Sequence, residues 1–177
     1  RRAVVSDGIA SSYANVGLIT GGFFEVLGAQ AVLGRRFTRT EDRDGAEPAA
    51  VISHGYWRRH FGGAPDVVGR RITINEQRSV VVGVMPPDLD YPRGVDIWRT
   101  TRSIPADSAF GIAAQREVNL IGRLRPGVTV EQASSELAAL DQQLATDAPT
   151  DYLLRRGFNI VVRPFAEVVI GGVRRTM

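Results

Sequence analysis

Ser53, His54 and His60 are close in the sequence, and hydrolases build nucleophilic sites from these residue types. The two histidines are six residues apart, which puts them on different faces of a helix and not in the i, i+4 pair that binds a metal. Ser53 has no histidine placed as in a nucleophile motif. Its position just before an apolar helical pattern favours a capping role. The sequence therefore predicts no nucleophilic or metal site here.

A group of carboxylates forms the second candidate site, in a polar and turn-rich segment at 34–48. It consists of Glu41, Asp42 and Asp44. Their spacing does not match the ligand pattern of a calcium loop, and no bidentate glutamate follows at the twelfth position. We expect these side chains to lie in a solvated loop. The sequence thus predicts no catalytic, cofactor-binding or metal-ligating residue, no cofactor, and a protein that is not an enzyme.

The composition excludes several further chemistries. The chain of 177 residues has no cysteine, so it holds neither a disulfide nor a thiolate metal site. All 22 basic residues are arginine, which removes P-loop and Schiff-base lysine chemistry. The arginines occur largely as scattered pairs, whereas a nucleic-acid-binding protein concentrates its positive charge on one element. We therefore expect no nucleic-acid binding.

The first third of the chain predicts short strands and two short helices. Alternating or continuous apolar residues predict strands at 3–5, 14–18 and 49–52. Thr20 and Ser53 are expected to cap the helices. Gly28 and Gly62 are expected to end them, because glycine readily adopts the left-handed conformation found there.

A hairpin is predicted at 70–75 and 78–85, with Val80, Val82 and Val84 sharing one face of its second strand. Its turn lacks the Asn-Gly pair that best suits a two-residue connection. Residues 88–117 are interpreted as loop and short edge segments. Trp98 is either a core residue or an exposed contact, and the core is favoured.

Patterns that predict regular secondary structure return in the last third of the chain. Residues 118–124 predict a strand, and 130–146 predict a long helix preceded by a capping box of Thr129 and Gln132. A final strand is predicted at 158–162. Strand–helix–strand units at 14–52 and 118–162 then suggest a split α/β sandwich with the hairpin region inserted between them.

Five stretches of the chain, in this order, resemble the extracytoplasmic domain of MacB-like ABC transporter permeases, part of the wider group of FtsX-like and lipoprotein-releasing permeases. The stretches are GGFFEVLGAQAVLGRRFTRTED (21–42), AAVISHGYWRRHFGGAPDVVGRRITINEQRSVVVGVMPP (49–87), DIW (96–98), VNLIGRLRPGVTVEQASSELAAL (118–140) and RPFAEVVIGGVRR (163–175). One departure is Asn75-Glu76, where the family often has Asn-Gly.

The resemblance implies an α+β fold. It has a porter-like lobe of βαβ units at 1–60 plus 116–177 and an inserted smaller β-rich lobe at 61–115. The implied function is mechanotransmission, in which ATP-driven closure on the cytoplasmic side moves the periplasmic domains as rigid bodies. The implied location is the periplasmic face of the bacterial inner membrane, between two transmembrane helices. The abrupt ends at Arg1 and Met177 fit that placement.

The resemblance also implies partners. These are an ABC ATPase subunit reached through the transmembrane part, a second permease copy, and a periplasmic adaptor or an outer-membrane channel. We expect the isolated domain to self-associate weakly or not at all. The alternative function is a periplasmic ligand- or peptide-binding module that captures its ligand between the lobes, where pockets commonly form.

Overall fold

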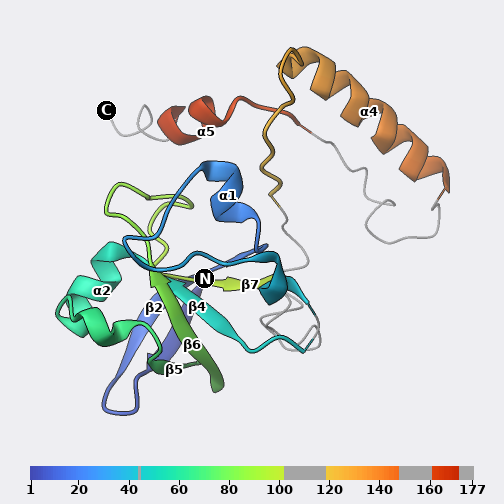
Figure 1. Cartoon of the computed structure of the whole chain (residues 1–177). Helices are drawn as coiled ribbons and strands as arrows, with labels where there is room; N and C mark the ends of the chain where they lie inside the picture. Colours follow the sequence, from blue (N-terminus) through green and yellow to red (C-terminus); the bar gives the residue numbers. More distant parts are fainter. Residues whose placement is uncertain (44, 102–118, 148–160, 172–177) are drawn as a thin grey trace. The chain divides into compact units, whose positions relative to one another are not determined.

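The computed structural model describes residues 1–43, 45–101, 119–147 and 161–171 (Figure 1). The chain divides into two compact units, Arg1–Leu120 (unit 1) and Ile121–Met177 (unit 2). Unit 1 contains a seven-stranded sheet with helices α1 (Phe23–Leu27) and α2 (His54–Phe61). The described part of unit 2 contains helices α4 (Val130–Asp147) and α5 (Phe165–Gly171). The mixed α/β character predicted from the sequence is confirmed.

The sheet of unit 1 closes on itself. Its strands are β1 (Arg2–Ser6), β2 (Ser11–Ile19), β3 (Leu33–Gly34), β4 (Ala49–Ile52), β5 (Arg71–Ile74), β6 (Gln77–Val84) and β7 (Ile97–Thr100). They follow the order β3-β6-β4-β7-β2-β1-β5, and β5 also pairs with β6. The pairings from β6 through β4, β7, β2, β1 and β5 therefore return to β6, and β3 is attached outside this ring. Because the sheet closes, the backbone N–H and C=O groups along its edge strands find partners that an open sheet would leave unpaired.

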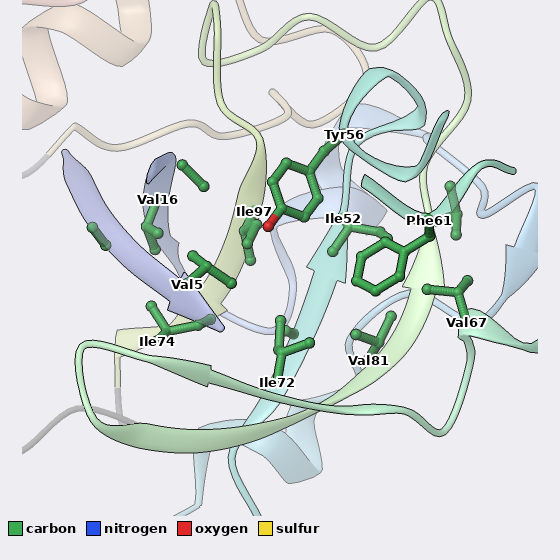
Figure 2. Packing of buried hydrophobic residues seen from close by; sticks show 14 residues of the cluster. Val5, Val16, Ile52, Tyr56, Phe61, Val67, Ile72, Ile74, Val81 and Ile97 are labelled. Atoms are coloured by element: carbon green, nitrogen blue, oxygen red, sulfur yellow. The ribbon is translucent and has the colours of Figure 1, made fainter. Parts of the chain in front are cut away.

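The inward side chains of these strands form the first core cluster, shown in Figure 2. On β1 and β5 the burial alternates, so that Val5, Ile72 and Ile74 are buried and the residues between them are more exposed. Helix α2 adds Tyr56 and Phe61 to the same cluster. The period of two along the strands thus selects which residues fill the ring, as expected for a sheet with one buried face.

A second core cluster lies on the opposite face of β4 and β7. It contains Phe24 from α1, Phe37 from the following loop, and Val51, Met85 and Trp98. Trp98 is fully buried, which confirms its predicted place in the core. The two clusters explain why β4 is buried on both faces and is apolar at all four positions.

Strand β7 corrects the prediction of loop and short edge segments around Ile97 and Trp98. It lies between β4 and β2, and all four of its residues are buried. The sequence did not reveal this, because a short central strand that contains Arg99 shows neither alternation nor an apolar run.

The direction of the strands also differs from the expected βαβ arrangement. Strand β2 is parallel to β7, and β7 is antiparallel to β4, so β2 and β4 run in opposite directions. Residues 14–52 therefore do not form a parallel βαβ unit, and the porter-like description is not confirmed. Strands from 1–60 and from 61–115 share one sheet. The lobe boundaries stay a prediction.

A β-bulge in β6 changes which valines share a face. Ala50 pairs with Val81, but the next residue of β4, Val51, pairs with Gly83. The extra residue, Val82, shifts the alternation of the strand. Val81 and Val84 consequently join the first cluster, whereas Val82 packs against the second. The predicted common face of Val80, Val82 and Val84 is therefore wrong.

The predicted hairpin of β5 and β6 is confirmed, with Ile74 paired to Gln77. Its two turn residues, Asn75 and Glu76, have φ values of 45° and 69°. Positive φ at both central residues is the signature of the type I′ turn. Asn75 also ties the turn to β1, because its Oδ1 accepts the backbone N–H of Val4 at 2.9 Å and its own N–H donates to the Val4 carbonyl at 2.9 Å.

Replacing Glu76 with glycine is expected to stabilise unit 1 by about 0.5–1 kcal/mol. The reason is that a left-handed conformation costs an ordinary L-residue about 1–2 kcal/mol. Glycine avoids this cost but loses more conformational freedom on folding, which offsets part of the gain. Chemical denaturation followed by tryptophan fluorescence reports unit 1, because both tryptophans, Trp57 and Trp98, belong to it. The matched control is Gln77→Gly, which places glycine in β6 and should destabilise. A lower midpoint for Glu76→Gly would contradict this reading of the turn.

The predicted helix ends are largely confirmed. The Ser53 Oγ accepts the N–H of Tyr56 at 3.1 Å, and Gly28 and Gly62 adopt left-handed conformations. Thr20 is not a cap, because α1 begins at Phe23 after Gly22 and no side chain caps it. Thr20 instead supplies its carbonyl to the N–H of Phe23.

Helix α4 confirms the long predicted helix of unit 2. Its capping box is formed by Thr129 and Gln132, with hydrogen bonds of 2.9 and 3.2 Å. The strand predicted at 118–124 is wrong for residues 119–124, which pair with no strand in the described ranges. Of the strand predicted at 158–162, residues 158–160 lie outside the described residues and 161–162 are not in a strand. Helix α5 was not predicted.

Candidate functional site

Helix α2 holds both histidines, and each contacts a different aromatic ring. His54 lies edge-on to Trp57, with ring centroids 5.4 Å apart. His60 stacks on Tyr56 at 4.2 Å. Ser53, the remaining candidate, uses its hydroxyl to cap the helix. The structure therefore brings these three residues onto one helix without joining them into a nucleophile–base pair.

The carboxylate of Glu41 is buried and hydrogen-bonded in the acidic segment, which corrects the expectation that this side chain is solvated. The Glu41 side chain is only 8% exposed. Its Oε2 accepts the backbone N–H of Thr38 at 2.7 Å and the Thr38 hydroxyl at 2.6 Å. Its Oε1 lies 2.6 Å from the Arg35 guanidinium. The sequence did not show this burial, because the groups that satisfy the carboxylate come from Thr38 and Arg35, two polar residues of a turn-rich segment.

Asp42 has a related structural role, and Asp44 lies outside the described residues. The Asp42 Oδ2 accepts the backbone N–H of Gly21 at 2.5 Å and so attaches the loop to the start of α1. Within the ranges that the structure describes, no three histidine, aspartate or glutamate side chains are placed to hold a metal ion. The acidic residues thus stabilise the loop.

Stability should depend on pH through Glu41. Burial alone would raise its pKa, but the hydrogen bonds from Thr38 and the ion pair with Arg35 outweigh it and lower the pKa. A lowered carboxyl pKa gives stability that is present above the ordinary value of 4.5 and is lost as the pH falls through the folded-state pKa. Glu41→Gln is expected to cost about 1–2 kcal/mol at pH 7.

The measurement is the unfolding free energy of both proteins between pH 3 and 7. The difference between wild type and Glu41→Gln should shrink as the pH falls below about 4.5, because protonated Glu41 loses the same ion pair. A difference that stays constant over this range would show that the Glu41 charge does not contribute.

Asp96 joins three elements, and the sequence did not single it out. Its Oδ1 lies 2.7 Å from the Arg59 guanidinium on α2, and its Oδ2 accepts the backbone N–H of Asn15 on β2 at 3.0 Å. Its backbone carbonyl accepts the N–H of Ser53 at 2.8 Å. Asp96 therefore fixes the start of α2 relative to β2 and β7. The DIW stretch pointed to its position but not to these contacts.

Arg99 is the most buried charged residue among those the structure describes. Its side chain is 2% exposed, and one guanidinium nitrogen donates to the Gln77 Oε1 at 3.1 Å. Burial lowers its pKa to about 10, so it remains charged at neutral pH. Arg99 lies two residues after Ile97 along β7 and so shares the inward face of the sheet with it. The hydrogen bond to Gln77 joins β7 to the first residue of β6.

The described geometry defines a mixed α/β domain with a closed sheet, in which polar side chains cap helices and join elements. The chain matches the family described as the MacB-like periplasmic core domain over residues 2–140, and it belongs to that family. This confirms the resemblance stated from the sequence. No match was found among curated proteins. No helix of the described residues has the length and apolar character needed to cross a membrane.

Two solved structures share the fold. The periplasmic region of MacB from Actinobacillus actinomycetemcomitans is 15% identical, with a TM-score of 0.62 over all of this chain and 73% of that one. The extracellular domain of the noncanonic ABC-type transporter YknZ from Gram-positive bacteria is 19% identical, with a TM-score of 0.51 over 63% of this chain. The alignment spans 55% of the YknZ chain. At these identities the likeness concerns the fold.

Proposed function

We propose that this chain is the extracytoplasmic domain of an ABC-type permease subunit. The observation that carries the proposal is the family match over residues 2–140, which includes most of the stretches singled out in the sequence. Structural likeness to the MacB periplasmic region and to the YknZ extracellular domain supports it. The proposed location is the periplasmic face of a bacterial inner membrane, with the chain attached to a membrane-spanning permease.

The proposed mechanism is mechanotransmission. ATP hydrolysis in a separate ABC subunit changes the transmembrane part, and the extracytoplasmic domains move as rigid bodies to drive export or periplasmic work. A second permease copy and a periplasmic adaptor or outer-membrane channel complete the proposed assembly. The closed sheet with two core clusters supports this role, because a well-packed domain transmits a displacement instead of absorbing it.

Spin labels can test the rigid-body movement in the full-length permease with its ATPase. Residues 1–177 contain no cysteine, so once any cysteine elsewhere in the complex is replaced by serine, Asp88→Cys provides one label site on an exposed loop of each copy. We expect the distance between the labels of two copies to differ between the nucleotide-free and ATP-bound states. An unchanged distance, in a transporter that hydrolyses ATP and exports, would contradict mechanotransmission through this domain and leave the family assignment intact.

The role proposed for the domain is mechanical, and the expectation that it is not an enzyme stays a prediction. In the described residues the candidate catalytic side chains cap helices, stack on aromatic rings or form structural ion pairs. The alternative of a periplasmic ligand- or peptide-binding module stays a prediction, since no observation in the described ranges favours it.

A further inference from the structure

The ring of strands in unit 1 closes through its shortest pairing. Strands β1 and β5 pair at Val5–Ile74 and Ser6–Thr73, whereas every other pairing in the ring extends over three to five positions. Each of these two strands has a longer pairing on its other side, because β1 and β2 form one hairpin and β5 and β6 form another. The contact of β1 with β5 therefore joins two hairpins that keep their own hydrogen bonds without it.

A third contact extends this pairing, and a side chain makes half of it. In an antiparallel sheet, the two residues of a hydrogen-bonded pair donate their N–H groups to each other's carbonyl oxygens. Asn75 donates its N–H to the Val4 carbonyl at 2.9 Å, but the Val4 N–H donates to Oδ1 of the Asn75 side chain, also at 2.9 Å. Asn75 has φ 45°, the left-handed conformation that its turn requires and that a strand residue does not adopt. The side-chain amide thus takes the place of a backbone carbonyl. We call the pairs Val4–Asn75, Val5–Ile74 and Ser6–Thr73 the β1–β5 seam.

Apolar packing also holds the β1–β5 seam closed. Val5 and Ile74 lie beside each other in the first core cluster (Figure 2), and they are 3% and 2% exposed. Separation of the two strands would expose both side chains to water, so the closed form predominates. The second core cluster, as the structure describes it, contains no residue of β1 or β5. Opening of the seam would therefore leave that cluster in place.

We propose that the β1–β5 seam opens as a unit in the otherwise folded protein, and that the Asn75 side chain sets how often it opens. Parts of a protein that open at a lower cost than global unfolding often coincide with hairpins and similar small motifs. The seam lies between two such motifs and has the fewest strand pairs in the ring.

An open seam would change how unit 1 moves. Strands β4 and β7 would stay paired in the middle of the sheet, while the β1–β2 hairpin could move relative to the β5–β6 hairpin. With the seam closed, the ring moves as one body. Asn75 would thus control a conformational change built into the fold. This inference concerns unit 1 alone and does not depend on the proposed transport role.

The test is amide hydrogen exchange of the 177-residue chain, measured by NMR at guanidinium concentrations below the unfolding transition. The reporters are the N–H groups of Ser6 and Thr73, which point into the seam because hydrogen-bonded pairs alternate along antiparallel strands. We expect them to exchange roughly tenfold or more faster than the amides of Val51 and Ile52 in β4. Their rates should also depend less on denaturant, because opening the seam exposes less surface than global unfolding. Equal rates and equal denaturant dependence at the two places would overturn the proposal.

Two substitutions of Asn75 test its control of the seam. Asn75→Gly keeps the left-handed conformation and removes Oδ1, and the matched control Asn75→Asp keeps an oxygen that can accept the Val4 N–H. Exchange of the Ser6 and Thr73 amides should be about fivefold faster in Asn75→Gly, the effect of losing one hydrogen bond, and close to wild type in Asn75→Asp. Equal exchange in Asn75→Gly and the wild type would overturn the role given to Asn75.

A reversible cross-link gives a second test. The Cα atoms of a hydrogen-bonded antiparallel pair are about 5.5 Å apart, which suits a disulfide, so Ser6→Cys/Thr73→Cys can close the seam covalently. Exchange at residues 6 and 73 should slow to the rates of β4 in the oxidised protein and become fast again on reduction. Fast exchange that persists in the oxidised protein would contradict opening at this seam. None of these results bears on the family assignment.

Discussion

Replacing Trp98 with alanine is expected to lower the free energy of unfolding of unit 1 by about 3–5 kcal/mol. Trp98 is fully buried in the second core cluster, edge-on to Phe24 with ring centroids 5.5 Å apart. It also belongs to β7, which pairs with a strand on each side. The cavity left by the indole would therefore separate α1 from the centre of the sheet.

The measurement is chemical denaturation followed by the fluorescence of Trp57, which remains in the variant. Trp98→Phe should cost less than half as much, because phenylalanine keeps an aromatic ring in the core. The indole Nε1 of Trp98 has no hydrogen-bond partner among the described residues, so the substitution removes no such bond. The matched control is Trp57→Phe, followed through Trp98. Trp57 is half-buried, and its Nε1 donates to the Ala64 carbonyl at 2.8 Å, so its loss should cost about 1 kcal/mol. A loss below 1 kcal/mol for Trp98→Ala would contradict the central place of β7.

Replacing Gly83 with alanine is expected to destabilise unit 1 by about 3 kcal/mol. Gly83 on β6 faces Gly34 on β3, and an added Cβ at residue 83 would overlap the backbone carbonyl of Arg35. A backbone carbonyl cannot rotate away as the end of a side chain can. The substitution would therefore force β3 away from β6 and disturb the loop that carries Arg35 and Glu41.

Gly22→Ala serves as the control for Gly83→Ala. Gly22 has φ −80°, and a Cβ there would meet no atom within 4 Å. It should change the unfolding free energy by no more than about 0.5 kcal/mol. Equal losses in the two variants would show that the cost reflects glycine in general and not the close contact of β6 with residue 35.

The local structure of the first half was largely predictable. Ser53 caps the start of α2 and Gly62 ends it. Helix caps depend on interactions between residues only a few positions apart, so the sequence can predict them. The alternation of Ile72 and Ile74 likewise identified the inward face of β5. These features are encoded in residue types at fixed spacing, so the sequence alone reveals them.

Features set by distant parts of the chain were not predictable. The central position of β7 depends on pairing with β2 and β4, which are more than forty residues away along the chain. The bulge at Val82 and the closure between β5 and β1 arise from the register of several strands together. No local pattern records a register, and this is why the face of Val80, Val82 and Val84 was predicted wrongly.

The candidate site shows the same division. The capping role of Ser53 followed from its position before a helix, and it is confirmed. The burial of Glu41 depends on Arg35, and the contacts of Asp96 depend on Arg59 and Asn15. Polar residues of this kind look solvated in a sequence, because their partners are brought to them only by the fold. The family assignment came from the order of the matching stretches.

The measurement that tests the central claim most directly is the side of the membrane on which this domain lies. In the full-length protein, with any cysteine outside residues 1–177 replaced by serine, Asp88→Cys would be the single thiol. A membrane-impermeant maleimide should label it in spheroplasts without lysis, as an extracytoplasmic permease domain requires. Labelling only after the membrane is broken would place the domain in the cytoplasm and contradict the proposed function.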